Sequence, residues 1–309
     1  MFPLPTLGCL LVLTCSHALL NISEEYPTAI KFDQKDDVTD GDFSYEDQDN
    51  WGGICQTGDA QSPIYLNEET VVNMDVPRVR FNYYNGTLQM PLVLSNNGHT
   101  ASLEITPTQL GPRAYITGAL LPGEFEAQSV HFHWGDRYSG GAEHVIASMR
   151  TEADAEMHIV HKNKRYATAS EASMHPDGLA VLAVLISSVR VPTPMETGLI
   201  KIFNRLPRIV RYNSRTTITE RFQVDELLEN VSRGRFFTYN GSLTTPDCAE
   251  AVTWIVFRDA IALNYRLIER LWNLRDSRSM RIVNNYRALQ SRNGRPVYYR
   301  NLRGLKNIL

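Results

Sequence analysis

The sequence of 309 residues predicts an α+β protein that is mostly β, with a large central sheet and a few peripheral helices. Short apolar runs dominate the middle of the chain and are separated by turns such as NNG, LPGE and HPDG. One of these runs, Leu179–Ile186, is continuously apolar, which is typical of a strand covered on both faces. Only Met195–Leu206 and Tyr265–Arg275 show the apolar spacing of amphipathic helices.

The remaining strands follow from runs that are rich in apolar residues and bounded by turn residues. They are expected at Leu92–Leu94, Ala101–Ile105, Ala114–Thr117, Gln128–Trp134, Glu143–Met149, Ala155–His161 and Ala251–Phe257. No internal repeat or linker interrupts them, so residues 43–309 are expected to form a single domain.

The first 42 residues differ in composition from this domain. Residues 1–18 carry no charge and contain the apolar stretch Leu7–Leu13 before Ser16-His17-Ala18, which predicts a secretory signal peptide cleaved near Ala18. A membrane anchor would need a longer apolar span of about 20 residues. Residues 19–42 form an acidic segment whose composition favours disorder. We therefore expect a secreted, extracellular protein without a stable membrane anchor.

Secretion changes the interpretation of the cysteines and of the glycosylation motifs. Cys9 and Cys15 leave with the signal peptide, and the remaining two cysteines indicate either one disulfide or two separately buried thiols. Four asparagines begin N-x-Ser/Thr motifs. The favoured glycosylation candidates are Asn21, Asn85 and Asn230.

The charge is distributed unevenly, although the net charge is only −3. Residues 19–50 contain ten Asp or Glu against two Lys, and residues 266–309 contain eleven Lys or Arg against two acids. Solvated surfaces are the usual explanation of such runs, and contact of the basic C-terminal face with an acidic glycan is the weaker alternative. Nucleic acid is not an expected partner of a secreted protein.

The segment SVHFHWG at 129–135 places two histidines one residue apart in an expected strand. Because side chains alternate along a strand, His131 and His133 share one face, while Val130, Phe132 and Trp134 pack on the other. A third histidine is available in AEMHIVH, where Glu156, His158 and Val160 share a face and His161 takes the opposite, structural side.

Three imidazoles from neighbouring strands would leave one position of a tetrahedral zinc ion open, as catalytic zinc sites do. Glu156 could accept a hydrogen bond from the second ring nitrogen of His158 and so orient that ligand. The H-x-H motif alone is also compatible with packing or with copper and iron sites. Together with E-x-H on a second strand, it favours a metal site.

Six segments, HFHWG, GAEH, AEMHIVH, PDGLAVL, NGSLTTP and VTWIV, resemble the α-class carbonic anhydrases in content and order, from about Tyr45 to about Gln290. The resemblance, closest to secreted members, implies a large twisted, predominantly antiparallel sheet with a zinc site in a central cleft. It implies Zn²⁺ ligation by His131, His133 and His158, with CO₂ and bicarbonate as substrates. Lowering the pKa of zinc-bound water is the property for which this family is the reference case.

The resemblance also implies roles for residues around the zinc. Thr244 and Glu143 would orient a zinc-bound hydroxide, and His99 would carry the proton to solvent. Asn285 would support His133. Tyr45, Asn97 and Thr245 correspond to positions that order water. The apolar substrate pocket would be formed by Val160, Val181, Leu243, Val252 and Trp254. Cys55 and Cys248 correspond to the disulfide of secreted members, which would steady the loop that carries Thr244.

Two positions depart from the family pattern. Ser129 replaces a glutamine that commonly supports the first ligand, and strand alternation turns Gln128 to the other face. Weaker zinc retention or a bridging water is the expected consequence. Asp247 replaces a usual proline near the mouth of the cleft. Asn240 begins a glycosylation motif beside the same loop and is for that reason not favoured as an acceptor.

The sequence predicts a zinc enzyme that hydrates CO₂ reversibly, and three other functions are the alternatives. A cupin would need a glutamate three or four residues after H-x-H, where this chain has Arg137 and Tyr138. A non-catalytic carbonic-anhydrase-like binding domain usually lacks a ligand histidine, and this chain keeps all three. Esterase activity is compatible as a side reaction of the same site.

Overall fold

The computed structural model describes residues 43–72, 74–147, 149, 153–191 and 197–301. The expected signal peptide, the acidic segment 19–42 and Asn21 lie outside these residues. No helix within the described part is both long and apolar enough to span a membrane.

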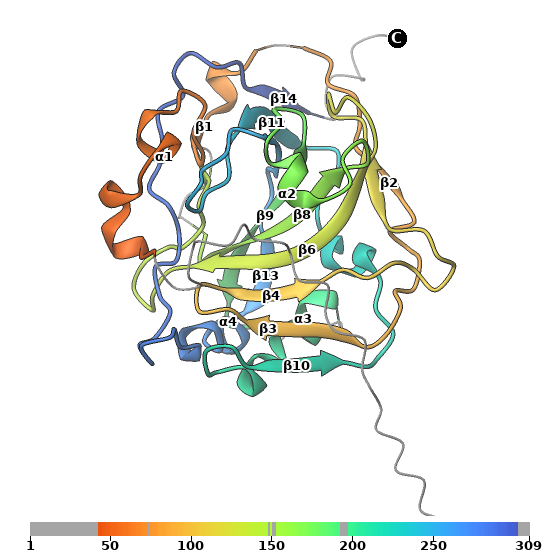
Figure 1. Cartoon of the computed structure of the whole chain (residues 1–309), viewed down its shortest axis with the longest axis vertical. Helices are drawn as coiled ribbons and strands as arrows, with labels where there is room; N and C mark the ends of the chain where they lie inside the picture. Colours follow the sequence, from red (N-terminus) through yellow and green to blue (C-terminus); the bar gives the residue numbers. More distant parts are fainter. Residues whose placement is uncertain (1–42, 73, 148, 150–152, 192–196, 302–309) are drawn as a thin grey trace, which may run out of the picture. The chain divides into compact units, whose positions relative to one another are not determined.

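A large mixed sheet organises the described residues (Figure 1). Its main path runs in the order β10 (Arg215–Ile218), β3 (Leu92–Asn96), β4 (Ala101–Glu104), β6 (Phe125–Trp134), β8 (Ala155–Asn163), β9 (Leu179–Val189), β12 (Val252–Phe257), β11 (Phe236–Gly241) and β14 (Tyr298–Arg300). Beside this path, β13 (Ile261–Asn264) pairs with β9, β5 (Tyr115–Thr117) pairs with β6, and β2 (Arg80–Asn82) pairs with β5. The strands rotate progressively across the sheet, so the predicted large, twisted sheet is confirmed.

Antiparallel pairs predominate in this sheet, as predicted. Within the described residues, only the pairs β9–β12 and β9–β13 are parallel. β9 lies in the interior of the sheet, and Leu179–Ile186 is buried throughout its length, which confirms that this run is covered on both faces.

Short helices surround the sheet. The α-helices are α1 (Ile54–Thr57), α2 (Ala169–Ala172), α3 (Gly198–Phe203) and α4 (Tyr265–Ile268), and the 3₁₀ turns are η1 (Tyr45–Asn50), η2 (Glu68–Thr70), η3 (Leu206–Arg208), η4 (Val224–Leu228) and η5 (Leu271–Asn273). The predicted helix Tyr265–Arg275 is therefore wrong as one continuous element, because the chain tightens after Ile268 and continues as η5. Ile268, Leu271 and Leu274 are nevertheless all buried in the core, so the apolar spacing identified the buried face correctly.

The other helix prediction, Met195–Leu206, begins outside the described residues. Within them, α3 covers Gly198–Phe203 and η3 begins at Leu206. The expected strand Glu143–Met149 is also shorter than predicted. Only β7 (Val145–Ile146) is a strand, and it pairs in parallel with β1 (Tyr65–Leu66) in a separate two-stranded sheet.

The two faces of the large sheet belong to different apolar clusters. On β9, Leu182 and Val184 join Ile159 and Phe132 in the larger cluster, which α3 and α4 help to cover. Val181 joins Trp254 and its neighbours in the other cluster. Because side chains alternate, the second face of β6, β8, β9 and β12 is the one that carries the predicted functional residues.

Candidate metal centre

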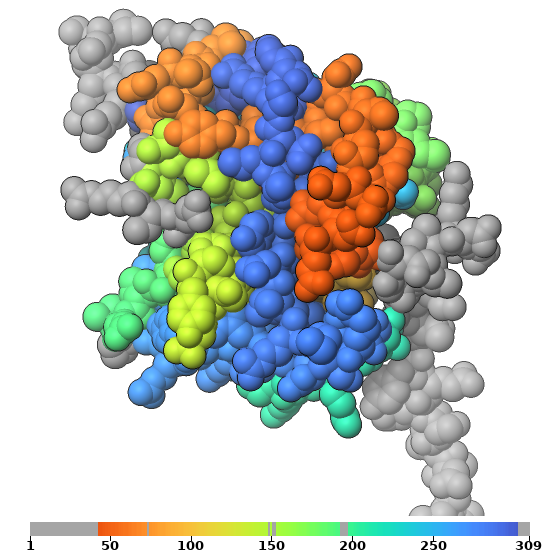
Figure 2. Space-filling model, turned by 90° about the vertical axis from the view of Figure 1, so that its left-hand side faces the viewer, coloured from red at the N-terminus to blue at the C-terminus, as the bar shows by residue number. Residues whose placement is uncertain are grey.

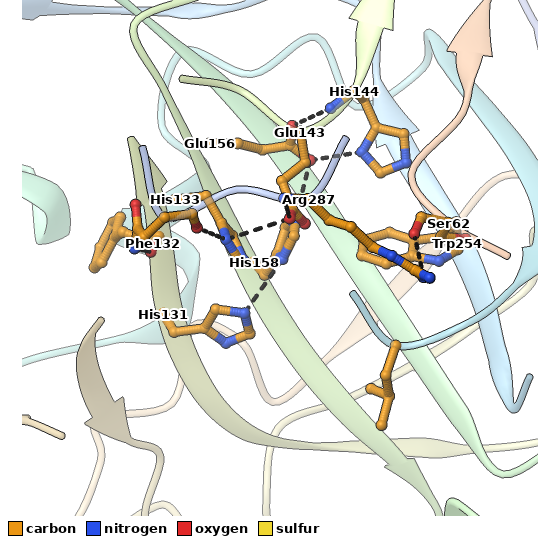
Figure 3. Close-up of polar contacts among 12 residues, drawn as sticks. Ser62, His131, Phe132, His133, Glu143, His144, Glu156, His158, Trp254 and Arg287 are labelled. Carbon is orange, nitrogen blue, oxygen red and sulfur yellow. Dashed lines mark hydrogen bonds and ion pairs between the residues drawn. The ribbon is translucent and has the colours of Figure 1, made fainter. Parts of the chain in front are cut away.

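The pairing of β6 with β8 brings the three predicted ligands together (Figure 3). His131 lies opposite His158, and His133 lies opposite Glu156. The Nε2 atom of His131 and the Nδ1 atom of His158 are 3.2 Å apart. One nitrogen from each of the three rings fits within a group whose members are all within 4.8 Å of one another. The period of two along each strand therefore produces one three-histidine cluster.

The second nitrogens of two of these rings are held by protein partners. His133 Nδ1 donates to the carbonyl of Asn285 over 2.8 Å, and His158 Nε2 donates to Glu156 Oε1 over 2.8 Å. These contacts fix the tautomers and leave the opposite nitrogens as acceptors. His133 Nε2 is buried and has no hydrogen-bond partner within the described residues.

This donor set fits Zn²⁺, which commonly takes neutral imidazole ligands in catalytic sites. Burial, with further contributions from the neighbouring rings, lowers the pKa of His131 well below its ordinary value. Burial lowers the pKa of His133 to about 4, against the opposing effect of its hydrogen bond to Asn285. The rings are accordingly neutral near pH 7, the form in which they can bind a metal.

Glu156 is shared between His158 and a residue for which the sequence analysis assigned no role, His144. The Nδ1 atom of His144 donates to Glu156 Oε1 over 2.7 Å, and its backbone N–H donates to Oε2 over 2.8 Å. Burial alone would raise the pKa of Glu156, but its interactions with His144 and His158 outweigh burial and hold the pKa far below its usual range. Glu156 is therefore an ionised carboxylate with three donors.

The contacts of His144 extend away from the histidine cluster. Its Nε2 lies 2.8 Å from the Tyr239 hydroxyl, which lies 3.1 Å from Ser62 Oγ. Tyr239 is on β11, a strand that the sequence analysis did not predict, and Ser62 is 177 residues from Tyr239 along the chain. The only local signal was the position of His144 inside the GAEH motif.

Glu143, the neighbour of His144, is buried, and its Oε2 lies 4.0 Å from the same His158 Nε2 that Glu156 contacts. Its Oε1 accepts a hydrogen bond of 2.8 Å from the backbone N–H of Arg287 and lies 3.5 Å from His133 Nδ1. Burial raises the pKa of Glu143 to about 7, and interactions that include the Thr244 hydroxyl partly oppose this rise. The structure thus places Thr244 beside Glu143.

Three of the five positions predicted to form the substrate pocket lie in register across the sheet. Val160 on β8 pairs with Val181 on β9, which pairs with Trp254 on β12. Val181, Val252 and Trp254 are buried in one cluster, and Val160 and Leu243 are partly buried against it. The Trp254 ring also contacts the His158 ring at a centroid distance of 4.9 Å. An apolar wall therefore adjoins the histidine cluster.

His99 lies on a turn next to a surface cavity of about 350 Å³. Its ring stacks on Phe43, with centroids 4.0 Å apart and an angle of 9° between the ring planes. Tyr45 and Asn285 line the same cavity. Asn97 instead uses its side-chain oxygen to accept the backbone N–H groups of His99 and Thr100, so it shapes the turn. Thr245 accepts the Cys248 N–H through its carbonyl.

A β-bulge between Ala127 and Ser129 interrupts the strict alternation of side chains along β6. Ala127 and Val130 both belong to the large core cluster, so the two residues between them do not alternate strictly, and the reason given for excluding Gln128 is wrong. The Gln128 amide donates to its own strand, at the carbonyls of Glu126 and Ala127. Among the described residues, neither Gln128 nor Ser129 hydrogen-bonds to His131.

Ser129→Gln is therefore expected to slow zinc dissociation by about 10-fold or more, because a longer amide could hold the Nδ1 of His131. Zinc release to a chelating dye measures this rate. Ser102→Gln, a substitution opposite His131 on β4, serves as the matched control. An unchanged zinc dissociation rate in Ser129→Gln would refute the idea that position 129 limits retention.

A disulfide joins Cys55 and Cys248, as expected, with Cα atoms 5.0 Å apart. Cys248 also donates its backbone N–H to Thr245 O, and the carbonyl of Cys55 accepts from Arg287 Nη2 over 2.8 Å. The disulfide thus connects the loop that carries Thr244 to Cys55, whose carbonyl contacts Arg287, the residue that hydrogen-bonds to Glu143.

Replacing both cysteines by serine is expected to lower the free energy of unfolding by about 2–5 kcal/mol, because a link across 193 residues no longer restricts the unfolded chain. For a domain of this size, the midpoint of thermal unfolding should fall by roughly 5–15 °C. Calorimetry of the parent and the variant at equal zinc occupancy measures this midpoint. A shift below about 2 °C would show that the link contributes little.

Asp247 adopts a backbone φ of 77°. Proline cannot take this value because its ring holds φ near −65°, so the loop conformation accounts for the absence of the usual proline. The sequon residues Asn85, Asn230 and Asn240 are all exposed, so exposure alone does not distinguish the favoured sites from Asn240.

A buried three-histidine cluster on the central strands of a large mixed sheet, with an acidic partner for one ring, defines a metal-site protein of the carbonic anhydrase type. The sequence pattern of the eukaryotic-type carbonic anhydrases matches residues 46–301, and the chain belongs to this family.

Named relatives agree with this assignment. The chain is 34% identical to bovine (Bos taurus) carbonic anhydrase 6 over 244 residues, which are 78% of this chain and 72% of the relative. It is 32% identical to human (Homo sapiens) carbonic anhydrase 7 over 246 residues, covering 78% of this chain and 88% of the relative. It is also 32% identical to mouse (Mus musculus) carbonic anhydrase 15 over 236 residues, which are 73% of this chain and 71% of the relative.

Proposed function

We propose that this protein is a zinc enzyme that converts CO₂ and water reversibly to bicarbonate and a proton. The observation that carries the proposal is the buried Nε2 of His133, which has no hydrogen-bond partner in the described part of the chain and belongs to a cluster with nitrogens of His131 and His158. The competing function, a non-catalytic binding domain, is disfavoured because such domains usually lack one of these histidines.

His131, His133 and His158 would hold the zinc ion. When bound, Zn²⁺ acts as a Lewis acid that allows its water to ionise near neutral pH. The protein's own contribution is orientation. Asn285 and Glu156 fix the rings of His133 and His158, so that little rearrangement is needed when the ion binds.

We assign Thr244 and Glu143 the task of orienting the attacking oxygen. The ionised carboxylate of Glu143 would accept a hydrogen bond from the Thr244 hydroxyl, and the backbone N–H of Arg287 favours that ionised form. The Thr244 oxygen can then accept a hydrogen bond from the nucleophile, which directs a lone pair toward the carbon of CO₂. The wall formed by Val160, Val181, Leu243, Val252 and Trp254 suits CO₂, a molecule without a dipole.

His99 is the proposed proton shuttle, since it lines a surface cavity and imidazole is the side chain generally used to exchange protons near neutral pH. Tyr45, Asn97 and Thr245 are proposed to order the water between the site and His99. Ser129 is proposed to leave the second nitrogen of His131 to solvent.

We further propose that residues 1–18 direct secretion, that residues 19–42 are an acidic N-terminal extension of the catalytic domain 43–309, and that Asn21, Asn85 and Asn230 are glycosylated. The exposure of Asn85 and Asn230 and the disulfide support an extracellular location.

Removal of the metal tests the proposed function. Stopped-flow CO₂ hydration should fall by at least 100-fold after treatment with a chelator and return with one equivalent of Zn²⁺ per chain. Mg²⁺ at the same concentration should not restore activity, because it prefers oxygen ligands. Full activity at a zinc content below 0.05 per chain would overturn the zinc mechanism, and no activity at full zinc content would support the binding-domain alternative.

A further inference from the structure

Two loops that the proposed reaction does not use carry a group of exposed arginines. Residues 208–215 contain three arginines and no acid, and residues 275–281 contain three arginines and the single acid Asp276. We define the arginine patch as five of these side chains, all of which are exposed: Arg211, Arg215, Arg275, Arg278 and Arg281. The whole chain has a net charge of −3, so this basic surface is a local feature and not a property of the protein at large.

Hydrogen bonds of the backbone and of one buried amide hold the two loops together. The N–H of Arg275 donates to the carbonyl of Val210 over 2.8 Å. The buried side chain of Asn96 donates to the carbonyl of Val210 over 3.3 Å and to that of Arg275 over 3.0 Å. Arg275 and Arg281 also pair across an antiparallel bridge. In Figure 2, blue residues of the C-terminal part accordingly lie beside turquoise residues at the lower end of the molecule. The patch is therefore one surface built from two distant segments.

The loops also pack closely against the turn that carries His99. Gly98 in this turn has a φ of 92°, and a Cβ atom at this position would lie 2.8 Å from the Tyr212 ring and 4.0 Å from the backbone nitrogen of Ser277. One residue of each loop thus approaches the same glycine. Close packing of this kind holds both loops in place, so the arginines extend from a preorganised base.

The acids near the patch neutralise only part of its charge. Asp276 Oδ1 accepts the backbone N–H groups of Arg278 and Met280 over 2.9 and 2.8 Å, and its Oδ2 contacts the Arg278 guanidinium at 2.8 Å. This carboxylate therefore shapes its own loop and compensates one arginine. Glu46 is exposed and is the other acid that lines the cavity bordered by Arg278. Five arginines against these two acids leave three positive charges.

Those three charges have identifiable positions. Arg275 donates to the carbonyl of Ser279 over 2.6 Å, a contact with a neutral group. Within the part of the chain that the structure describes, the guanidinium groups of Arg211, Arg215 and Arg281 have no ion-pair or hydrogen-bond partner. Their N–H donors are available to a ligand.

A sulfated polysaccharide has the chemistry that this surface recognises. Guanidinium groups bind oxyanions through two parallel N–H donors, and sulfate esters remain ionised throughout the physiological pH range. Because the charges come from two loops and not from one pocket, they suit a polymer with repeated charges. Single-stranded nucleic acid is usually bound through aromatic rings placed among the charges. Tyr212 is the one aromatic residue of the two loops, and its ring packs against Gly98.

We propose that the arginine patch binds sulfated polysaccharide chains, with Arg211, Arg215 and Arg281 as the main contacts. A glycan is preferred to other polyanions because of the proposed extracellular location, on which this part of the proposal rests. The contacts are exposed, so salt should screen them. Affinity is expected to fall by at least about 10-fold between 50 mM and about 500 mM NaCl.

Fluorescence anisotropy of a labelled heparin octasaccharide titrated with the full chain tests the proposal. We expect a dissociation constant below about 10 μM at low salt. The double variant Arg211→Glu/Arg281→Glu should bind at least about 10-fold more weakly, because like charges then face the ligand. Arg78→Glu/Arg80→Glu changes the net charge equally at two exposed arginines beside a different cavity. This matched control should change the affinity by less than about threefold, since its charges lie outside the patch.

Three results would overturn the proposal. The first is a parent protein that binds the octasaccharide with a dissociation constant above about 100 μM. The second is an equal loss of affinity in the two double variants at equal thermal midpoints, which would mean that net charge and not the patch governs binding. The third is a single-stranded oligonucleotide of equal charge that binds as tightly as the octasaccharide. These measurements are independent of turnover, so a chain that binds heparin but does not hydrate CO₂ would contradict the proposed enzymatic function alone.

Discussion

Replacement of His133 by alanine is expected to lower kcat/KM for CO₂ hydration by more than about 100-fold and to reduce zinc content at micromolar metal. Loss of a group that only supports a ligand typically costs about 10–100-fold, and His133 would itself be a ligand. Its Nε2 lacks any partner within the described residues, so the substitution removes a metal-facing nitrogen without breaking another hydrogen bond of that atom.

Two measurements separate this effect from damage to the fold. His175→Ala removes a histidine that stacks on Tyr166, away from the cluster, and should keep full zinc content and activity. Circular dichroism of the metal-free proteins should show the same secondary structure for His133→Ala and the parent. Retention of both zinc and turnover in His133→Ala would exclude the three-histidine site as the metal centre.

Acid is expected to destabilise the metal-free protein strongly between pH 6.5 and pH 4. Burial lowers the pKa of His161 to about 4 and that of His133 to about 4, and it also lowers the pKa values of His131 and His158. In this range the unfolded chain binds protons that the folded chain does not, so the free energy of unfolding falls as the pH falls. A histidine pKa lowered from 6.5 to about 4 corresponds to about 3 kcal/mol.

Titration of Glu143 changes the free energy of unfolding in the opposite direction. Because burial raises its pKa to about 7, the folded chain keeps a proton that the unfolded chain releases between pH 4.5 and pH 7, which favours folding at the acidic end. Four histidines outweigh one glutamate, so we expect a net loss of at least about 3 kcal/mol from pH 7 to pH 4. Below pH 4.5, protonation of the unfolded form of Glu156 increases the loss, since its folded pKa is held low.

Urea unfolding of the metal-free protein at pH 7 and pH 4 measures this difference. His161 provides an internal control outside the metal site, since it lies on the opposite face of β8, where its Nε2 is 2.5 Å from the Tyr84 hydroxyl. His161→Gln should reduce the pH dependence by about 3 kcal/mol, because glutamine does not titrate. Equal stability of the parent at both pH values would contradict the expectation.

The central strands of the sheet were predictable from local sequence patterns. Gln128–Trp134 and Ala155–His161 were recognised as strands because period-two alternation is visible within seven residues. The shorter outer strands were missed, among them β10 and β14, since they offer few residues for a pattern. Phe236–Gly241 was missed because this strand is buried almost throughout and shows no polar alternation.

The apolar spacing of Tyr265–Arg275 identified the buried side chains but not where the helix ends. A buried stripe at helical spacing is compatible with α and 3₁₀ turns alike, and only packing against the rest of the chain decides between them. Glu143 and His144 were similarly assigned to a strand, whereas their hydrogen bonds to Arg287 and Glu156 hold them outside β7.

The sequence by itself determined which histidines could share a face, because the alternation of a strand is a local property of its backbone. It also showed, through its motifs, which family the chain resembles. The resemblance also named Asn285, 152 residues from His133, as the support of that ring, and the structure supplies the contact of 2.8 Å. Tertiary structure alone decided the contacts of His144 with Glu156 and Tyr239. It also revealed the bulge that invalidates simple alternation at Gln128. Such contacts depend on how distant segments pack, and no local periodicity encodes them.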